Sequence, residues 1–307
     1  MLRHTPTTHC PYFLTEVNDM YKIAILGCEN SHANHFLRLI SEGFYPELQV
    51  VGIYSCEREA ADKLGAEYNV PVMDDYAALK GQVDGVMITA RHGDNHFKYA
   101  KPYMDDCIPM FIDKPITCTE LDALEFMATA QAQGIRLCGG STCAGYPNTL
   151  KLAAAVRDKA MGELRGGSVV CPYYFDSPYG GFYFYAQHLV EIMTTVFGGE
   201  VRRVFAHRAG SELTFIAQYD GFEVTGRYIE GGKYYSASVY GSEKMLCEEL
   251  TGYGDSFKNE MNDMLALLRG ENMKKSYHTF IKPVFIMNTI LRSLKSGRWE
   301  DIPEYNV

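Results

Sequence analysis

The chain has 307 residues, of which 47% are hydrophobic and 22% charged, with a net charge of −9. This composition is ordinary for a soluble globular protein with two domains or one large one. The negative charge and the lack of a Lys/Arg cluster argue against a nucleic-acid partner, and no apolar run approaches the ~20 residues of a membrane helix.

The nine cysteines are scattered and form no Cys-x-x-Cys pair. We therefore expect reduced thiols in a cytoplasmic protein, and neither a disulfide framework nor a metal site. Residues 1–19 lack the basic start and apolar core of a signal peptide, and Met20 directly precedes the first predicted strand. We expect residues 1–19 to be an extension of the fold.

Strands and helices alternate from residue 20 to residue 140. Short apolar runs typical of buried parallel strands lie at 21–26, 48–54, 70–73, 84–89, 108–113 and 135–138. Helical periodicity lies at 31–40, 57–68 and 117–134, the last opened by a predicted capping box, Thr117-x-x-Glu120. Six strands with short crossovers predict an α/β domain, a doubly wound Rossmann-type parallel sheet over residues 20–140.

Residues 141–307 show a different pattern. A helix is predicted near 148–159, a strand at 166–175, and several strands separated by glycines between 201 and 240. Two helices follow, at about 256–268 and 278–294. This half predicts an α+β domain with antiparallel strands.

The sequence Asp113-Lys114-Pro115 closes the predicted strand 108–113 and leads into a helix. Ligands of open α/β sheets bind at the carboxyl ends of the strands. Pro115 restricts the backbone of Lys114, so the lysine is held on a stiff segment. A desolvated lysine in such a crevice can exchange protons with a substrate hydroxyl, although an ordinary surface lysine at a turn is the alternative.

Three features, in this order, resemble the Gfo/Idh/MocA oxidoreductase family. They are a first strand that ends in Gly27, Asp113-Lys114-Pro115 where the family usually has Glu-Lys-Pro, and Gly180-Gly181 followed by His188 on a helix. His96 also resembles a histidine usual in the family. The resemblance implies a dinucleotide-binding domain followed by a domain with a large, mostly antiparallel sheet, which often mediates oligomers. We accordingly expect a homo-oligomer, a dimer or tetramer.

The resemblance further implies hydride transfer at a hydroxyl-bearing carbon of a sugar, polyol or similar small substrate, with NAD or NADP as cofactor. Lys114 would relay protons and orient the substrate, and His188 would be the acid/base. Asp113 and His96 are expected beside the cofactor. Relatives carry an aspartate four residues before the histidine, where this chain has Phe184.

The glycine-rich loop departs from the family pattern. A dinucleotide loop reads G-x-G-x-x-G, whereas this chain reads Gly27-Cys28-Glu29-Asn30-Ser31-His32. Asn30 and Ser31 are good N-cap residues, and a helix N-terminus favours an anion. Glu29 would repel a pyrophosphate unless it turns away. The alternative is a capped helix with no ligand.

Other candidate site residues leave alternatives open. Ser55 follows the second strand where an acid usually binds ribose; with Arg58 it would tolerate a 2′-phosphate, while Glu57 could serve NAD. Arg91 and His92 could contact nicotinamide, a phosphate or a carboxylated substrate, or be ordinary loop residues. Tyr183 and Tyr185 would offer hydroxyls and stacking surfaces to the substrate. Glu191 could orient His188, and His32 and His35 lack a third metal ligand.

Three functions remain as hypotheses. The first is an NAD(P)-dependent dehydrogenase or reductase acting on CH–OH groups. The second is a glycosidase that uses its nicotinamide cofactor transiently, which the loss of the aspartate permits. The third, motivated by Glu29, is a non-catalytic ligand-binding or regulatory protein on the same scaffold.

Overall fold

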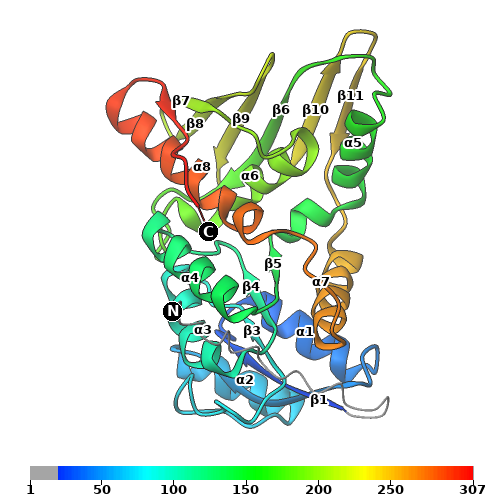
Figure 1. Ribbon diagram of the computed structural model, residues 1–307, viewed down its shortest axis with the longest axis vertical. Helices are drawn as coiled ribbons and strands as arrows, with labels where there is room; N and C mark the ends of the chain where they lie inside the picture. The colour runs from blue at the N-terminus through cyan, green and yellow to red at the C-terminus, as the bar shows by residue number, and fades with distance from the viewer. Residues whose placement is uncertain (1–19, 307) are drawn as a thin grey trace, which may run out of the picture.

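The computed structural model describes residues 20–306, apart from the side chains of residues 253–255. Two sheets, one above the other in Figure 1, organise this part of the chain. The predicted extension, residues 1–19, lies outside the described residues. The fold class predicted from the sequence is confirmed: a parallel sheet in the first half is followed by a large, mostly antiparallel sheet.

The first sheet has five parallel strands in the order β2-β1-β3-β4-β5. The strands are β1 (Tyr21–Leu26), β2 (Leu48–Tyr54), β3 (Gly85–Ile88), β4 (Met110–Asp113) and β5 (Leu137–Gly140). All residues of β3 and β4 are buried, as expected of parallel strands covered on both faces. Their carboxyl ends meet at one edge, and the loops that follow them build the site described below.

The predicted third strand, 70–73, is not a strand. Val72 forms only an isolated parallel bridge with Ile53. Pro71 has no N–H with which to extend the ladder, and bends begin at Asp74. The sheet therefore has five strands and not the six predicted.

Helices and short turns connect these strands. They are α1 (Ser31–Ser41), α2 (Arg58–Tyr68), α3 (Asp94–Ala100), the 3-10 turn η1 (Lys101–Asp106) and α4 (Glu120–Gln133). The predicted capping box of α4 is wrong by two residues. Thr119 is the N-cap: its Oγ1 accepts from the backbone N–H of Asp122 at 3.0 Å. Thr117 instead donates to the carbonyl of Thr119.

The second sheet has seven strands in the order β11-β10-β6-β9-β8-β7-β12. These are β6 (Leu164–Tyr173), β7 (Arg203–Ala209), β8 (Glu212–Gln218), β9 (Glu223–Glu230), β10 (Ser236–Gly241), β11 (Met245–Glu249) and β12 (Glu300–Asp301). All neighbouring pairs are antiparallel except β6 and β9, which are parallel. The exposed and buried residues of β9 alternate, so one face of the sheet meets the core.

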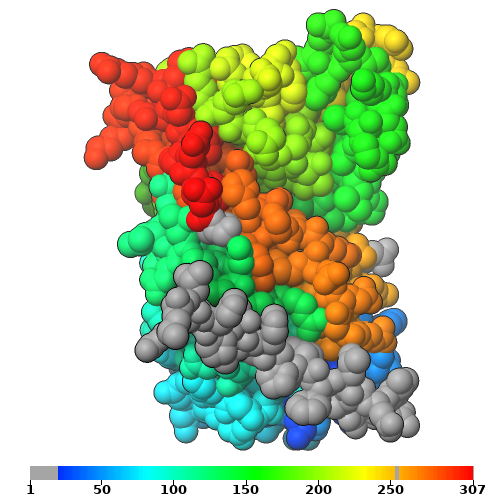
Figure 2. Space-filling model, in the orientation of Figure 1, coloured from blue at the N-terminus to red at the C-terminus, as the bar shows by residue number. Residues whose placement is uncertain are grey.

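Helices cover one face of this sheet. They are α5 (Pro147–Arg157), which follows the turn η2 (Thr142–Gly145), α6 (Tyr183–Phe197) and α8 (Tyr277–Ser296) (Figure 1). Helix α7 (Tyr253–Leu268) leaves the second sheet and returns to pack beside α1 and β5. In Figure 2, α7 and the beginning of α8, coloured orange, cross the visible face between the lower and upper parts of the molecule. The C-terminal segment thus ties the two sheets together.

The cysteines correct one expectation. Seven of them are free thiols, but Cys107 is disulfide-bonded, so the described chain is not entirely reduced. Among the described residues, no helix is long and apolar enough to cross a membrane.

Candidate active site

A cavity of about 450 Å³ lies where the loops after β1, β3 and β4 meet the second half of the chain. Residues from both halves line it: Asn30, Ser31, His32, His35, Arg91, Lys114, Thr142, Cys143, Tyr146, Tyr174, Tyr179, Phe184, Tyr185, His188, Tyr235 and Phe257. Lys114 comes from the first sheet and His188 from α6, so the two groups proposed for catalysis face one cavity.

Lys114 is held firmly at the end of β4. It is 4% exposed, and its Nζ donates to the carbonyl of Phe184 at 3.2 Å. The Nζ also lies 4.8 Å from the centre of the Phe184 ring and 5.2 Å from that of Tyr185. Burial lowers the pKa of Lys114 below its ordinary value, Asp113 opposes that shift and Arg91 adds to it. The peptide bond to Pro115 is cis.

His188 is fixed by a residue that the sequence had not indicated. Its Nδ1 lies 2.7 Å from Oγ of Ser141, which also accepts from the backbone N–H of Cys143 at 3.2 Å. Burial, with Lys114 and His32 acting in the same direction, lowers the pKa of His188 well below its ordinary value. His188 is therefore a neutral imidazole near neutral pH.

Glu191 does not orient the His188 ring, contrary to expectation. Its carboxylate accepts from the backbone N–H of Ser141 at 2.9 Å, from the Gln187 amide and from Lys275 at 2.8 Å. Its effect on His188 is indirect, because it holds the backbone of Ser141, whose side chain contacts His188. A Cβ on Gly140 would lie 2.6 Å from the Glu191 carboxylate, so this approach requires glycine.

The altered glycine loop still packs closely against the backbone of the loop that follows β3. Gly27 has φ of +91°, and a Cβ there would lie 2.3 Å from Ala90. The side chain of Glu29 turns away from the cavity, accepting from Ser55 Oγ at 2.7 Å and from the backbone N–H of Arg91 at 3.0 Å. Glu29 thus links three loops and is not among the lining residues.

Asn30 caps α1 and faces the cavity together with Ser31. The Asn30 side chain accepts from the backbone N–H of His32 and donates to Asp113 at 3.0 Å. Asp113 is fully buried below the cavity, 2.7 Å from Nδ1 of His32. Burial opposes ionisation of Asp113, but His32 and Lys114 outweigh it and lower its pKa. Asp113 therefore supports the lining residues and does not face the cavity.

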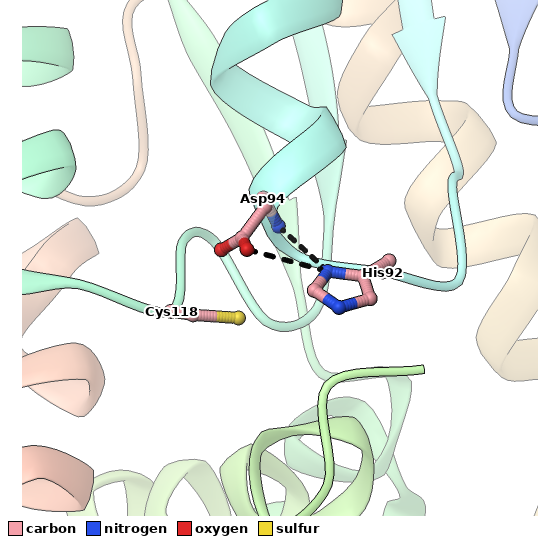
Figure 3. Close-up of side chains that lie close together, drawn as sticks. All are labelled: His92, Asp94 and Cys118. Atoms are coloured by element: carbon pink, nitrogen blue, oxygen red, sulfur yellow. Dashed lines mark hydrogen bonds and ion pairs between the residues drawn. The ribbon is translucent and has the colours of Figure 1, made fainter. Parts of the chain in front are cut away.

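Arg91 and His92, although adjacent in sequence, lie in different surroundings. Arg91 lines the cavity, donates to the Tyr179 hydroxyl at 2.7 Å and lies 4.9 Å from that ring centre. His92 lies away from the lining, in a cluster with Asp94 and Cys118 (Figure 3). Its Nδ1 accepts from the backbone N–H of Asp94 at 3.3 Å.

The His92–Asp94–Cys118 cluster offers one nitrogen, one oxygen and one sulfur within 4.8 Å of one another. Among the described residues it is the group that could hold a metal ion. Burial raises the pKa of the Cys118 thiol, with Asp94 acting in the same direction, so the sulfur is a neutral thiol here. The cluster is adjacent to Gly180, where a Cβ would lie 3.4 Å from the His92 ring.

His96 is a structural tie and not a cavity residue. It is fully buried, and its ring nitrogens lie 2.5 Å from the carbonyl of Pro115 and 2.7 Å from that of Ala90. It thereby joins the loop that carries Arg91 to the loop that carries Lys114.

Ser55 and Arg58 also lie outside the cavity lining. The Ser55 hydroxyl is engaged by Glu29, and the exposed Arg58 pairs with Asp62 at 2.7 Å and with Asp74 at 2.5 Å. Of the two tyrosines, Tyr185 lines the cavity. Tyr183 points elsewhere, since its hydroxyl donates to Asn288 at 2.7 Å.

A second cavity, of about 290 Å³, shares Thr142 with the first. Glu260 of α7 lines it, and the Oε2 atom of Glu260 is buried without a hydrogen-bond partner. Burial raises the pKa of Glu260 well above its ordinary value, and Asp113 acts in the same direction.

Several lining residues were not predicted from the sequence. Thr142, Cys143 and Tyr146 follow β5, and Tyr174, Tyr179 and Tyr235 lie in loops of the second half. The position after β5 was a usable signal, because it too is the carboxyl end of a parallel strand. His32 had been considered only as a metal ligand, whereas its role is the contact with Asp113.

Residues 21–140 match the model of the Gfo/Idh/MocA family, described as an oxidoreductase family with an NAD-binding Rossmann fold. This match confirms the resemblance noted in the sequence. None of the curated proteins compared with this chain is a match.

Solved structures share the fold over nearly the whole chain. A myo-inositol dehydrogenase from Corynebacterium glutamicum is 14% identical, with a TM-score of 0.79, over 93% of this chain and 100% of that one. A scyllo-inositol dehydrogenase from Lactobacillus casei, solved with NAD(H) and scyllo-inositol, is 12% identical, with a TM-score of 0.78, over 92% and 99%. GenD2 from gentamicin A biosynthesis, solved with NAD, is 14% identical, with a TM-score of 0.82, over 96% and 99%. At these identities the likeness concerns the fold.

Proposed function

Because residues 21–140 belong to the Gfo/Idh/MocA oxidoreductase family with an NAD-binding Rossmann fold, we propose that this chain is a dehydrogenase of small hydroxylated compounds. The substrate is a sugar, polyol or similar molecule, as in the inositol dehydrogenases of the same fold. The observation that carries the proposal is that Lys114 and His188 line one cavity. In this proposal residues 20–140 hold the cofactor, and residues 141–307 provide the substrate wall and the assembly surface.

The residues present fit a dinucleotide. Asn30 and Ser31 place the N-terminus of α1 at the cavity, where backbone N–H groups favour a pyrophosphate. Gly27 permits the close approach of the loop at Ala90. The Glu29 carboxylate accepts from the Ser55 hydroxyl and from the backbone N–H of Arg91, which hold it away from the cavity. When bound, the nicotinamide accepts or donates the hydride; the chain supplies the proton chemistry.

Ser141 determines how His188 acts. The serine oxygen accepts from the backbone N–H of Cys143 and lies within hydrogen-bond distance of Nδ1 of His188. In the tautomer that we propose, the serine hydroxyl donates to Nδ1, and the neutral imidazole carries its proton on Nε2, where it donates a hydrogen bond to the substrate oxygen. Lys114, whose pKa burial lowers, takes the hydroxyl proton as a free amine in the direction of oxidation. In the direction of reduction the same ammonium returns it.

We propose NAD and not NADP as the preferred cofactor. Arg58, the cation nearest the end of β2 in sequence, is paired with two aspartates, Asp62 and Asp74. These carboxylates would repel a 2′-phosphate, and Ser55 is engaged by Glu29.

We also propose a homo-oligomer assembled through the second sheet. The helices α5, α6 and α8 cover one face (Figure 1), while residues such as Tyr240, 40% exposed, lie on β10 outside that core. A sheet with one uncovered face commonly packs against another copy. Light scattering after size exclusion tests this, and a monomer at micromolar concentration contradicts it.

One observation favours a second function, a ligand-binding protein without turnover. Glu29 occupies donors, the Ser55 hydroxyl and the Arg91 N–H, that a ligand could otherwise use. A binding protein would bind NAD and small polyols but would form no NADH.

The test combines binding with turnover. We expect 1 mM NAD to raise the melting temperature, since a ligand at about 100 times its Kd adds about 2.7 kcal/mol to the free energy of unfolding. We expect NADH formation with at least one polyol or sugar, and its loss in Lys114→Met. The control is Lys98→Met, an exposed lysine of α3. The absence of a shift with both NAD and NADP contradicts the proposal; retained cofactor without net NADH supports transient use of the cofactor.

A further inference from the structure

In the described part of the chain, the arginine, lysine and histidine residues that line the cavity are not accompanied there by any acidic side chain. They are Arg91, Lys114, His32, His35 and His188, and no carboxylate occurs among the lining residues of the described chain. The whole chain, by contrast, has a net charge of −9. The cavity is therefore a basic site in an acidic protein, a distribution that attracts an anion.

Two acids beside these residues, Asp113 and Glu29, are engaged by other donors. Asp113 accepts from Asn30 and from the backbone N–H of Lys114, and it lies 2.7 Å from Nδ1 of His32. Glu29 accepts from Ser55 and from the backbone N–H of Arg91. Neither carboxylate lines the cavity.

The two cations instead have neutral partners. The Lys114 ammonium donates to the Phe184 carbonyl and faces aromatic rings. The Arg91 guanidinium donates to the Tyr179 hydroxyl and lies over its ring. A half-buried guanidinium without a carboxylate partner is costly, so an anionic ligand gains more at Arg91 than it would at an exposed site.

The Arg91 guanidinium faces a different part of the cavity from the proposed pyrophosphate site. The N-terminus of α1, with Asn30 and Ser31, serves the pyrophosphate. Arg91 contacts Tyr179, and the Tyr179 ring lies 5.3 Å from that of Phe184 at the beginning of α6. Arg91 is thus directed to the wall contributed by the second half of the chain, where the proposed function puts the substrate.

We propose, on the basis of that function, that the substrate is a hydroxy acid of the sugar class, with its carboxylate bound by Arg91. The planar guanidinium fork matches a carboxylate in a bidentate pair. Lys114 and His188 remain at the reacting hydroxyl. Oxidation would break the C–H bond, whose electron pair would pass to the nicotinamide, and the O–H proton would pass to Lys114.

The experiment compares matched pairs with NAD. Hexoses are compared with hexuronates, hexitols with hexonates, and hexose 6-phosphates form a third arm. A charge-assisted hydrogen bond of about 1.5–3 kcal/mol predicts at least about a tenfold higher kcat/KM for the carboxylated member. Arg91→Gln removes this preference by raising KM for the acid, and leaves KM for NAD unchanged. Arg202→Gln, an exposed arginine paired with Asp220, is the control.

The outcomes distinguish the inference from the function on which it rests. A neutral compound that is used as well as its acid, a preference for the phosphate, or an Arg91→Gln effect confined to KM for NAD overturns the inference while the dehydrogenase stands. If nothing is oxidised, calorimetry with NAD present decides: binding of a hexuronate that Arg91→Gln abolishes supports the ligand class and contradicts turnover. No such binding overturns the inference.

Discussion

Oγ of Ser141 lies 2.7 Å from Nδ1 of His188, and this hydrogen bond joins the loop after β5 to helix α6. It connects the segment that leaves the first sheet to the imidazole that faces the cavity. The serine is in turn anchored through its N–H by Glu191. The orientation of His188 therefore depends on both sheets.

Ser141→Ala should lower kcat by about ten- to a hundredfold with little change in KM for NAD, because the imidazole loses the partner that fixes its tautomer. Steady-state kinetics and the pH profile measure this effect. Ser141→Thr keeps the hydroxyl and should restore most of the activity. If the alanine variant matches the parent chain, Ser141 does not position His188.

The pH dependence of oxidation should follow Lys114. Burial lowers the pKa of Lys114, and a lysine with a lowered pKa loses its proton at a lower pH than an exposed one. We expect kcat/KM to rise with pH and to level off below the ordinary pKa of lysine. Because the pKa of His188 is lowered well below its ordinary value, no second limb should occur near pH 6.5. A limb that persists unchanged in the residual activity of Lys114→Met would assign it to another group.

Glu260→Gln should stabilise the protein at alkaline pH. The pKa of Glu260 is raised in the folded state, so the folded chain binds its proton more tightly than the unfolded chain does. The stability of the parent chain therefore falls as pH rises from the unfolded pKa towards the folded one. The gain in melting temperature should be larger at pH 8 than at pH 5. Glu271→Gln, at an exposed acid that lines the same cavity, is the control, and equal gains at both pH values would contradict the argument.

Asp74→Asn should increase the use of NADP relative to NAD. The change removes a carboxylate that holds Arg58 and repels a 2′-phosphate. The ratio of kcat/KM for the two cofactors measures the effect, for which we expect about a three- to tenfold change. Glu42→Gln, an exposed acid paired with Arg38 in the same manner, is the control. An unchanged ratio would place the adenosine ribose away from Arg58.

Much of the fold was predictable from local pattern. The apolar runs at 21–26 and 48–54 became β1 and β2 with the predicted bounds, because buried parallel strands leave an uninterrupted hydrophobic signal. The run at 70–73 is also apolar but forms only a bridge, since Pro71 has no N–H for a ladder and the chain bends at Asp74.

By itself the sequence determined which residues could do chemistry at the ends of strands: Lys114 after β4, Arg91 after β3 and Asn30 after β1. Strand order and the direction of parallel strands guarantee that such positions share one edge. Tertiary structure decided which of them face the cavity. It turned Glu29 and His96 into ties between loops, and it brought Ser141 to His188 across 47 residues of chain. Contacts of this kind depend on how two separately formed layers pack, and packing is a property of the whole chain.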